Sequence, residues 1–312
     1  MRVVDLHCDT LYKHVINQIP LDDPENEVQV DYSPNHHKLQ CYAIWLPDSF
    51  SDSQAEAIVF KAAKCLESEC GRLNIHLIKH CEQIRDEVEK NSNTAFFTIE
   101  NGKALNGKLE NIREFSKLGV KMMTLTWNAH NCIGDGADVT NPQGLTCFGK
   151  QAISEMENVG IIIDISHASE KLFWEVAENT KRPFVASHSN AFSITSHRRN
   201  LSDSQIEEII KRKGLFGLNF HNAFLNINPD NASLTDILRH TDHFLSLGGE
   251  DSLCFGSDFD GGILPNDIKN SRIYNNIYEC FSRHHYSDRT IKKIFYDNSL
   301  NFFENFDNYG SL

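Results

Sequence analysis

Short apolar runs separated by polar segments recur along the whole chain. Eight of these runs are too short for an ordinary helix and too continuously apolar for a half-exposed strand, a pattern typical of strands buried on both faces. Most are bounded by turn-forming residues, which supports the same interpretation. The predicted strands cover residues 3–6, 41–46, 95–99, 120–126, 161–165, 184–187, 215–219 and 253–257.

Between the predicted strands, apolar residues recur with helical spacing. The clearest case is residues 202–213, where Ser202 and Gln205 form a capping-box pattern. Gly214 follows at the position where such a helix would stop. Five further helices are predicted at residues 111–118, 148–158, 169–178, 234–247 and 287–303.

Eight strands alternating with helices predict a parallel (β/α)₈ barrel of the TIM type. A doubly wound open sheet is the alternative, but it rarely needs eight strands, and no glycine-rich phosphate loop follows the first run. Two stretches exceed a minimal barrel, residues 20–38 and 51–93, and we interpret both as insertions. No linker marks a boundary, so residues 1–312 are predicted to form a single domain.

Composition narrows the class of partner. The chain has 312 residues and a formal net charge of -13, which argues against nucleic acid or an anionic membrane as a partner. The sequence contains no run of about 18 apolar residues, the length that a membrane-spanning helix needs. Nine cysteines without regular spacing are typical of reduced thiols, so we expect a cytoplasmic protein acting on a small molecule.

Metal-binding residue types stand at the C-terminal ends of the predicted strands. In a parallel barrel these ends meet over one cavity. Imidazole and carboxylate groups suit zinc, and five of them can hold two ions if one carboxylate bridges, for which Glu100 is the natural candidate. Two ions about 3.5–4 Å apart can share a hydroxide and polarise a scissile carbonyl. The residues at the strand ends are His7, Asp9, Glu100, His167, His188 and Asp258.

Six short motifs follow one another along nearly the whole chain. They are Asp-Leu-His-Cys-Asp at 5–9, Ile-Glu-Asn-Gly at 99–102, Asp-Ile-Ser-His at 164–167, Ser-His-Ser at 187–189, Arg-Arg-Asn-Leu at 198–201 and Gly-Ser-Asp-Phe-Asp-Gly at 256–261. Together they resemble the motifs of the renal (membrane) dipeptidase family. The resemblance implies a barrel of the amidohydrolase type with two zinc ions, which cleaves dipeptides that have free amino and carboxyl ends.

The resemblance also implies a role for each ligand. By position, His7 and Asp9 bind one ion, His167 and His188 bind the other, and Glu100 bridges them. Asp258 would handle protons or the substrate amine, and Arg199 would hold the substrate carboxylate. The planar guanidinium of arginine matches a carboxylate bidentately, as lysine cannot, which favours the same role for Arg199.

The chain departs from the family pattern at the end of the fourth predicted strand. There Trp127 stands at the position of the renal enzyme's catalytic histidine. Tryptophan donates one hydrogen bond but carries neither a proton nor a charge in catalysis. His130, three residues further on, is the candidate to replace that histidine, and a role as an ordinary loop residue is the alternative.

Two other functions remain open at this level. One is another binuclear amidohydrolase, acting on cyclic amides or N-acyl amino acids, because one barrel supports many chemistries. Those relatives commonly show a His-x-His motif in the first strand and many use a carboxylated lysine, whereas this chain has His7, Asp9 and Glu100. The other is an inactive barrel with a binding role. The sequence also leaves open the preferred dipeptides, their chirality, and whether the chain forms a homodimer.

Overall fold

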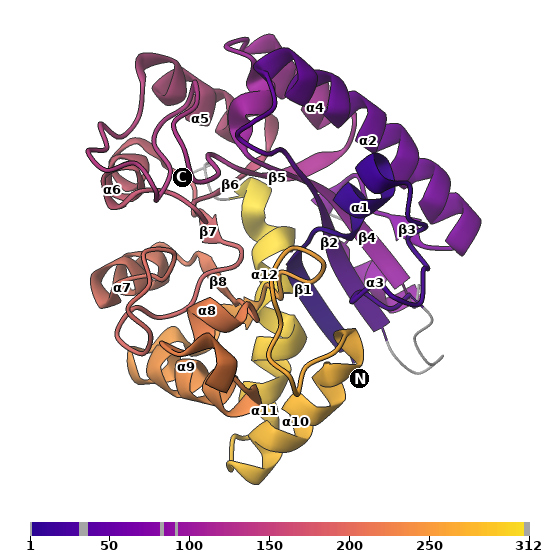
Figure 1. Ribbon diagram of the computed structural model, residues 1–312, viewed down its shortest axis with the longest axis vertical. Coiled ribbons are helices and arrows are strands. Elements are labelled where there is room, and N and C mark those ends of the chain that lie inside the picture. The colour runs from indigo at the N-terminus through magenta and orange to yellow at the C-terminus, as the bar shows by residue number, and fades with distance from the viewer. Residues whose placement is uncertain (1, 31–36, 82–83, 91–92, 309–312) are drawn as a thin grey trace.

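The eight apolar runs form the strands of a closed parallel barrel (Figure 1). The structure is a computed structural model that describes residues 2–30, 37–81, 84–90 and 93–308. Pairing of β2 with β4 closes the ring, so the predicted (β/α)₈ barrel is confirmed. In order around the barrel, its strands in the described chain are β1 (Arg2–Cys8), β2 (His37–Trp45), β4 (Asn93–Glu100), β5 (Val120–Thr124), β6 (Ile162–Asp164), β7 (Val185–Ala186), β8 (Leu215–Leu218) and β9 (Leu253–Phe255).

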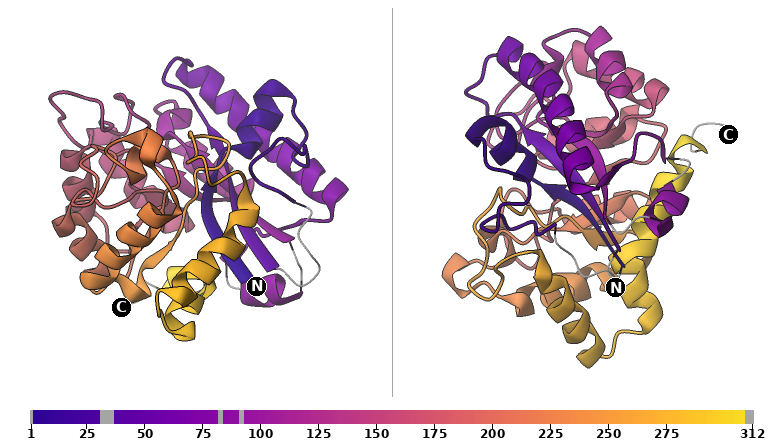
Figure 2. Two further views of the ribbon diagram at one scale, coloured as in Figure 1. Left: turned by 60° about the horizontal axis from the view of Figure 1, so that its bottom comes forward. Right: turned by 90° about the vertical axis from the view of Figure 1, so that its right-hand side faces the viewer.

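Most helices surround the barrel strands, whereas α12 (Asn298–Asn305) is seen in the middle of the ring in Figure 1, and Figure 2 gives two further views. The α-helices are α1 (Thr10–Asn17), α2 (Asp52–Leu73), α3 (Ile84–Lys90), α4 (Glu110–Lys117), α5 (Cys147–Val159), α6 (Glu170–Asn179), α7 (Asp203–Lys211), α8 (Asn222–Leu225), α9 (Leu234–Ser246), α10 (Tyr274–Arg283), α11 (Asp288–Lys292) and α12 (Asn298–Asn305). The helix expected at 287–303 contains a π-helical stretch, Lys293–Asp297, between α11 and α12. Short 3₁₀ segments are η2 (Gly102–Leu105), η3 (Pro229–Asn231), η4 (Gly249–Asp251), η5 (Ser271–Ile273) and η7 (Phe306–Asn308).

The segment 51–93 contributes a long helix to the outside of the barrel. Ser51 begins α2 with a capping box, in which its side chain accepts from the backbone of Gln54 and the Gln54 side chain accepts in return. A short strand, β3 (His76–Leu77), then pairs with the first half of β4, while β5 pairs with the second half. The strand β4 therefore has two neighbours on one edge.

The first expected insertion is fixed to the loop that follows β9. The Asp260 carboxylate accepts hydrogen bonds from the backbone of Glu27 at 2.9 Å and from Lys13 Nζ at 2.6 Å. Residues 31–36 of this stretch lie outside the described residues. The described part of the insertion is thereby tied to the C-terminal face of the barrel.

Gly214 has a different role from the helix stop that its position predicts. Helix α7 ends at Lys211, and Lys213 takes the left-handed conformation with φ 60°. A Cβ atom on Gly214 would lie only 2.2 Å from the carbonyl oxygen of Phe184. Glycine is therefore required here because β7 and the start of β8 approach each other closely.

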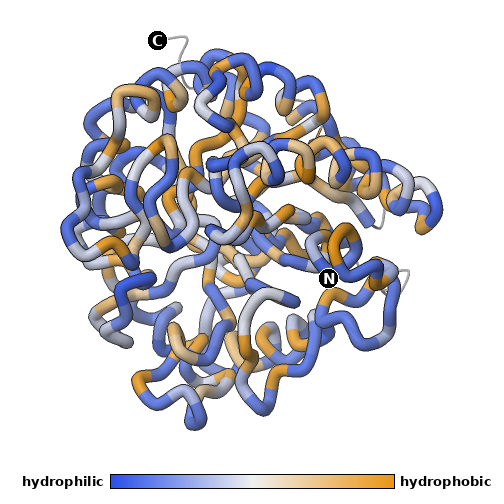
Figure 3. Tube along the Cα trace, turned by 45° about the horizontal axis from the view of Figure 1, so that its top comes forward, coloured by the Kyte–Doolittle hydropathy of each residue, from blue (hydrophilic) through white to orange (hydrophobic). Residues whose placement is uncertain are grey.

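The hydrophobic core fills the barrel and the layer between its strands and helices. Large aromatic side chains are fully buried in this layer, and Phe216 stacks on Phe244 of α9 with ring centroids 4.5 Å apart. Hydrophobic segments run through the interior of the molecule, and hydrophilic stretches lie mostly at its edge (Figure 3). Among the described helices, none combines the length and apolar character that crossing a membrane needs.

Candidate active site

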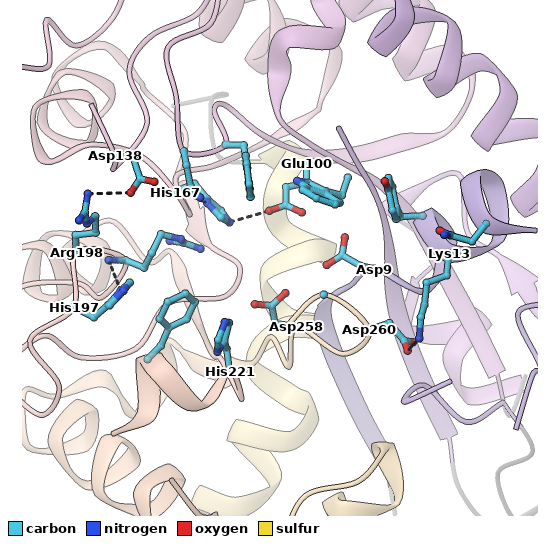
Figure 4. A pocket seen from close by; sticks show the side chains of 18 of the residues that line it. Asp9, Lys13, Glu100, Asp138, His167, His197, Arg198, His221, Asp258 and Asp260 are labelled. Atoms are coloured by element: carbon cyan, nitrogen blue, oxygen red, sulfur yellow. Dashed lines mark hydrogen bonds and ion pairs between the residues drawn. The ribbon is translucent and has the colours of Figure 1, made fainter. Parts of the chain in front are cut away.

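The C-terminal ends of the strands bring the six expected strand-end residues to one cavity region. His7 lies in β1 and Asp9 directly follows it, whereas Glu100 is the last residue of β4. The other three, His167, His188 and Asp258, follow β6, β7 and β9. Figure 4 shows Asp9, Glu100, His167 and Asp258 facing a common space.

Glu100 lies between the imidazole groups, with each carboxylate oxygen facing a different histidine. Its Oε1 is 2.8 Å from His167 Nε2 and 3.8 Å from His188 Nε2. Its Oε2 is 3.5 Å from His7 Nε2. A carboxylate that presents its two oxygens to two separate imidazole sets has the arrangement that a bridging ligand needs.

The other carboxylates approach His7. Its Nε2 lies 3.5 Å from Asp9 Oδ2 and 3.9 Å from Asp258 Oδ1. The ligand atoms of His7, Asp9 and Asp258 all lie within 4.8 Å of one another, and so do those of His7, Glu100 and His188. Both groups are buried, and such groups of nitrogen and oxygen atoms are sized for divalent cations.

Several buried ligand atoms in this cluster have no hydrogen-bond partner. They are Nε2 of His7, Nε2 of His188 and Oδ1 of Asp9. All three residues are at most 4% exposed, so water outside the protein does not compensate them. Leaving buried polar atoms unsatisfied costs stability, and a cation at this position would satisfy them. The residues present therefore fit divalent metal ions.

Electrostatics in the cluster follow from burial and from its mutual contacts. Burial lowers the pKa of His188 well below its ordinary value and that of His167 to about 3, so both rings are neutral. Burial opposes the charge of Glu100, but its contacts with the imidazole groups of His167 and His7 prevail and hold its pKa below the usual range.

Two other residues of the cluster have raised pKa values. Burial and the charge of Glu100 raise the pKa of Asp9 to about 8. The pKa of His7 is raised because contacts with Asp9 and Glu100 outweigh its burial. Cations bound here would displace these protons, since metal ligands bind in their deprotonated forms.

Neighbouring side chains orient two of the imidazole rings. Asn128 Oδ1 lies 2.8 Å from His167 Nδ1 and accepts its proton, which leaves the lone pair of Nε2 beside Glu100. Directly after β7, Ser187 Oγ lies 2.8 Å from His188 Nδ1 and donates to Asp164 Oδ2 at 2.5 Å. Such contacts fix the tautomer of a metal-binding histidine and the direction of its ring.

Two residues of the site have a positive φ. His167 and Asp258 both take left-handed conformations, with φ 68° and φ 64°. Non-glycine residues adopt this region at a cost, and such residues cluster at functional sites.

Beside the cluster lies a cavity of about 560 Å³. Arg199 and Asp258 both line it. Asn219 donates to Asp258 Oδ2 at 2.9 Å. Burial raises the pKa of Asp258 above its ordinary value, and the charge of Glu100 acts in the same direction.

His130 is not among the residues that line this cavity in the described chain. Its Nδ1 lies 2.7 Å from Asp135 Oδ1, its side chain is 63% exposed, and a backbone bridge joins the same two residues. The short loop turns the ring toward Asp135, so chain proximity to Trp127 does not bring it to the site. Trp127 itself lines the cavity and packs edge-on against Trp45, with ring centroids 5.1 Å apart.

Several further cavity residues are not among those singled out from the sequence, and His197, His221 and Phe224 are three of them. They lie in the connections after β7 and β8, where no periodicity distinguishes them. The available signal is the position of His197 directly before the two arginines at 198 and 199. His221 and Phe224 carry no comparable signal.

Comparison with known proteins agrees with this geometry. The model of the membrane dipeptidase family, peptidase family M19, matches residues 1–311. A protein of Klebsiella pneumoniae described as an uncharacterized protein in the pqqA 5' region is 32% identical over 216 residues, which cover 66% of this chain and 80% of that protein. The barrel and its cluster are those of a metallo-hydrolase. The chain belongs to the membrane dipeptidase family.

Solved structures share the fold at low sequence identity. A metallo peptidase from Rhodobacter sphaeroides, liganded with a phosphinate mimic of the dipeptide L-Ala-D-Ala, has a TM-score of 0.89 and 23% identity, covering 98% of this chain and 99% of that one. The dipeptidase AC of family M19 has a TM-score of 0.91 and 24% identity, with 99% of both chains covered. The probable dipeptidase PvdM from Pseudomonas aeruginosa has a TM-score of 0.83 and 18% identity, covering 99% of this chain and 96% of that one.

Proposed function

We propose that this protein is a zinc-dependent dipeptidase that hydrolyses dipeptides with free amino and carboxyl ends. The observation that carries the proposal is the position of Glu100, whose two oxygens face different histidines beside a cavity that also contains a buried arginine. Family membership supports the same reaction class. We further propose a single domain and a cytoplasmic location, the latter because each of the nine cysteines is a free thiol.

The proposed metal ligands divide into two sets. His7 and Asp9 would hold one ion, His167 and His188 the other, and Glu100 both. Two bound zinc ions would supply an activated water and polarise the scissile carbonyl. The protein's own part is to exclude bulk water and to keep the ligands deprotonated and directed at the ions, which the burial of the cluster favours.

Arg199 is the proposed site for the substrate's C-terminal carboxylate. Its guanidinium is buried, and Nε and Nη2 have no hydrogen-bond partner among the described residues. Burial lowers the pKa of Arg199 to about 10, so the group stays charged at neutral pH. A buried cation without a counter-ion favours an anionic ligand, and a carboxylate matches the guanidinium fork.

Asp258 is the proposed proton carrier. Asn219 holds its Oδ2, whereas Oδ1 faces His7 and the ligand cluster. In this arrangement Oδ1 would accept the proton released when water attacks and deliver it to the leaving amine, which is general acid–base catalysis by one carboxylate. Trp127 takes no proton in this scheme.

The proposed function is tested with the zinc-loaded protein and a panel of substrates. The panel contains dipeptides of both chiralities at the C-terminal residue, their C-terminal amides and N-acetyl forms, hydantoins and N-acyl amino acids. We expect hydrolysis of free dipeptides with about two ions bound per chain. Arg199→Lys should raise KM for free dipeptides far more than for their amides. Preferential hydrolysis of hydantoins or N-acyl amino acids, or no turnover with both ions bound, would contradict the proposal.

A further inference from the structure

Phe224 stands at the centre of one wall of the cavity. Its ring centroid lies 4.6 Å from that of His197 and 4.5 Å from that of His221. The guanidinium carbon of Arg199 lies 5.5 Å from the same centroid. All four side chains line the cavity, and we call them the arginine wall. Figure 4 shows His197 and His221 across the pocket from Glu100.

A backbone contact fixes the tautomer of His197. The N–H of Arg199 donates to His197 Nδ1 at 3.2 Å, so this nitrogen carries a lone pair. In a neutral imidazole the proton then resides on Nε2. Burial, followed by the charge of Arg199, lowers the pKa of His197 and favours this neutral form. His197 therefore has an N–H donor at the far end of its ring.

His221 is arranged in the same way at the start of α8. It is the N-cap residue, and its Nδ1 accepts from the backbone N–H of Ala223 at 3.3 Å. The side-chain oxygen of Asn222 lies 3.1 Å from the same nitrogen and would require the opposite tautomer. The backbone contact determines the tautomer. The Asn222 side chain can be rotated to present its NH₂ group to Nδ1, whereas a backbone N–H can only donate. His221 also has its proton on Nε2.

The arginine wall carries positive charge without a matching anion. Buried Nε and Nη2 of Arg199 have no hydrogen-bond partner among the described residues. The ring contacts of His197 and His221 within the described part of the chain are made by Nδ1, which leaves Nε2 of each ring available to a ligand in the cavity. The neighbouring Arg198 is different, because it forms an ion pair with Asp138 at 3.1 Å. The unpaired donors of the wall therefore belong to Arg199 and the two histidines.

A carboxylate can use all of these donors at once. Its two oxygens offer about four acceptor positions, of which a guanidinium fork occupies two. Two imidazole N–H groups can occupy positions that remain, and they add directionality to the binding of the carboxylate. A carboxamide in the same place would direct its own NH₂ donors at these donors, so the wall should discriminate strongly between an acid and its amide.

We propose that His197 and His221 are substrate-binding residues that donate from Nε2 to the C-terminal carboxylate held by Arg199. This inference rests on the proposed function, since it assigns recognition of the dipeptide's carboxyl end to three side chains. Phe224 holds the three donors together by its ring contacts. Selectivity for a free carboxylate is then a property of the wall and not of Arg199 alone.

Two substitutions at each histidine separate donation from a merely structural role. His197→Asn and His221→Asn keep an acceptor near the Nδ1 position for the backbone N–H but remove the distal donor. His197→Gln and His221→Gln keep a donor near the Nε2 position and lose the acceptor. A structural role predicts that the asparagine variants are tolerated and the glutamine variants are not, whereas the proposed role predicts the reverse.

The readout is binding of a phosphinate dipeptide isostere to the zinc-loaded protein, measured by calorimetry together with metal content. Each asparagine variant should bind the free acid about 10-fold more weakly, the cost of a hydrogen bond to a charged group, with unchanged zinc. Binding of the matching carboxamide should stay constant, and the glutamine variants should lie within about 3-fold of the unaltered protein. His284→Asn, at the exposed end of α10, is the matched control.

Each other result has a defined meaning. Equal losses on acid and amide, tolerance of the asparagine variants, or an unaltered protein that does not prefer the acid would overturn the inference. Acid-selective binding that depends on His197 and His221, without hydrolysis of any dipeptide, would support the inference and contradict the proposed function. The two failures are therefore distinguishable.

Discussion

The two sides of the cavity have opposite electrostatic character. On one side is the ligand cluster, formed by His7, Asp9, Glu100, His167 and His188, whose side chains lie within a few ångströms of one another. On the other side is the arginine wall, where Arg199 lies against the ring of Phe224 and two of its guanidinium nitrogens have no acceptor among the described residues. The ligand cluster is suited to bind cations, and the arginine wall is suited to bind an anion. A zwitterionic ligand bound beside metal ions would satisfy both.

The two sides are also held in place by different chemistry. Beneath the cluster, the buried carboxylate of Asp164 accepts from the backbone N–H groups of Ser166 and Ser187, at 3.0 Å and 2.9 Å. Asp5 does the same on β1, accepting from the backbone N–H of Ser257 at 2.9 Å and from Tyr274 Oη at 2.9 Å. Charged acceptors make strong hydrogen bonds, so the base of the cluster is stiff.

Behind the arginine wall the supports are neutral. His240 on α9 accepts from the backbone N–H of Ala191 at 3.2 Å and donates to the Leu225 carbonyl at 3.1 Å. Asn200 donates to the Phe224 carbonyl at 2.9 Å. These contacts join the loop after β7 to helix α8. We therefore expect perturbations of the two sides to be separable by metal content, by pH and by KM.

The largest effect is expected at Glu100, because it faces both sets of histidines. Glu100→Gln should weaken both metal sites together and reduce kcat by roughly 10³-fold, the several kcal/mol that metal ions contribute to catalysis. His7→Ala should empty mainly one site. Elemental analysis alongside the dipeptidase assay checks this, and loss of a single ion from both variants would argue against a bridging role.

The second effect concerns how the free energy of unfolding depends on pH through His240, which lies behind the arginine wall. Burial lowers the pKa of His240 from 6.5 to about 4, so the unfolded chain binds this proton more tightly than the folded protein. The stabilisation is complete above about pH 6.5 and is lost as the pH falls toward 4, in total on the order of 3 kcal/mol. Below that range both states are protonated and the loss stops.

Urea unfolding of the protein and of His240→Gln, followed from pH 7.5 to pH 4, measures this contribution. The variant cannot titrate at this position, so its free energy of unfolding should decline less over the interval. Its lower stability at neutral pH does not affect the comparison, because only the slope with pH is used. Parallel slopes for the two proteins would exclude His240 as the source.

A smaller effect is expected from the support beneath the cluster. Asp164→Asn keeps the size of the side chain but weakens the acceptor for Ser187, which orients His188. Zinc affinity should fall by about 10-fold or more, as for other groups that hold a metal-binding histidine. Asp22→Asn, which alters an exposed ion pair with Arg72, is the control. Competition with a chelator gives both affinities, and equal values would show that Ser187 orients His188 without Asp164.

The barrel was predictable from sequence because each buried strand is a short continuous apolar run. The ligand cluster was predictable as a group because metal-binding residue types stand at the ends of those strands, where barrel topology gathers them. The arginine wall was not predictable from the sequence. His197 and His221 meet around Phe224 only when two irregular connections dock against each other, and that contact leaves no local pattern. His130 shows the reverse case, where closeness in the chain suggests a contact that the Asp135 pairing prevents.

The smallest expected effect is that of Trp127→His, a substitution that should raise kcat. Its ring lies between Trp45 and His167, with centroids 5.1 Å and 6.0 Å away, so the position points at the proposed metal site although tryptophan cannot carry a proton. Trp127→His would place a second type of donor there and should raise kcat by a few-fold if an oxyanion donor is limiting, well below the 10²-fold that losing such a donor costs.

The same change removes the indole ring that packs beside Trp45 in the cavity lining, so KM for dipeptides with large side chains should rise at the same time. Steady-state kinetics on one small and one aromatic dipeptide separate the two effects, with His130→Ala as a control that should leave kcat unaltered because its ring faces Asp135. An unchanged or lower kcat for Trp127→His with intact zinc would show that the site does not need a donor from this strand.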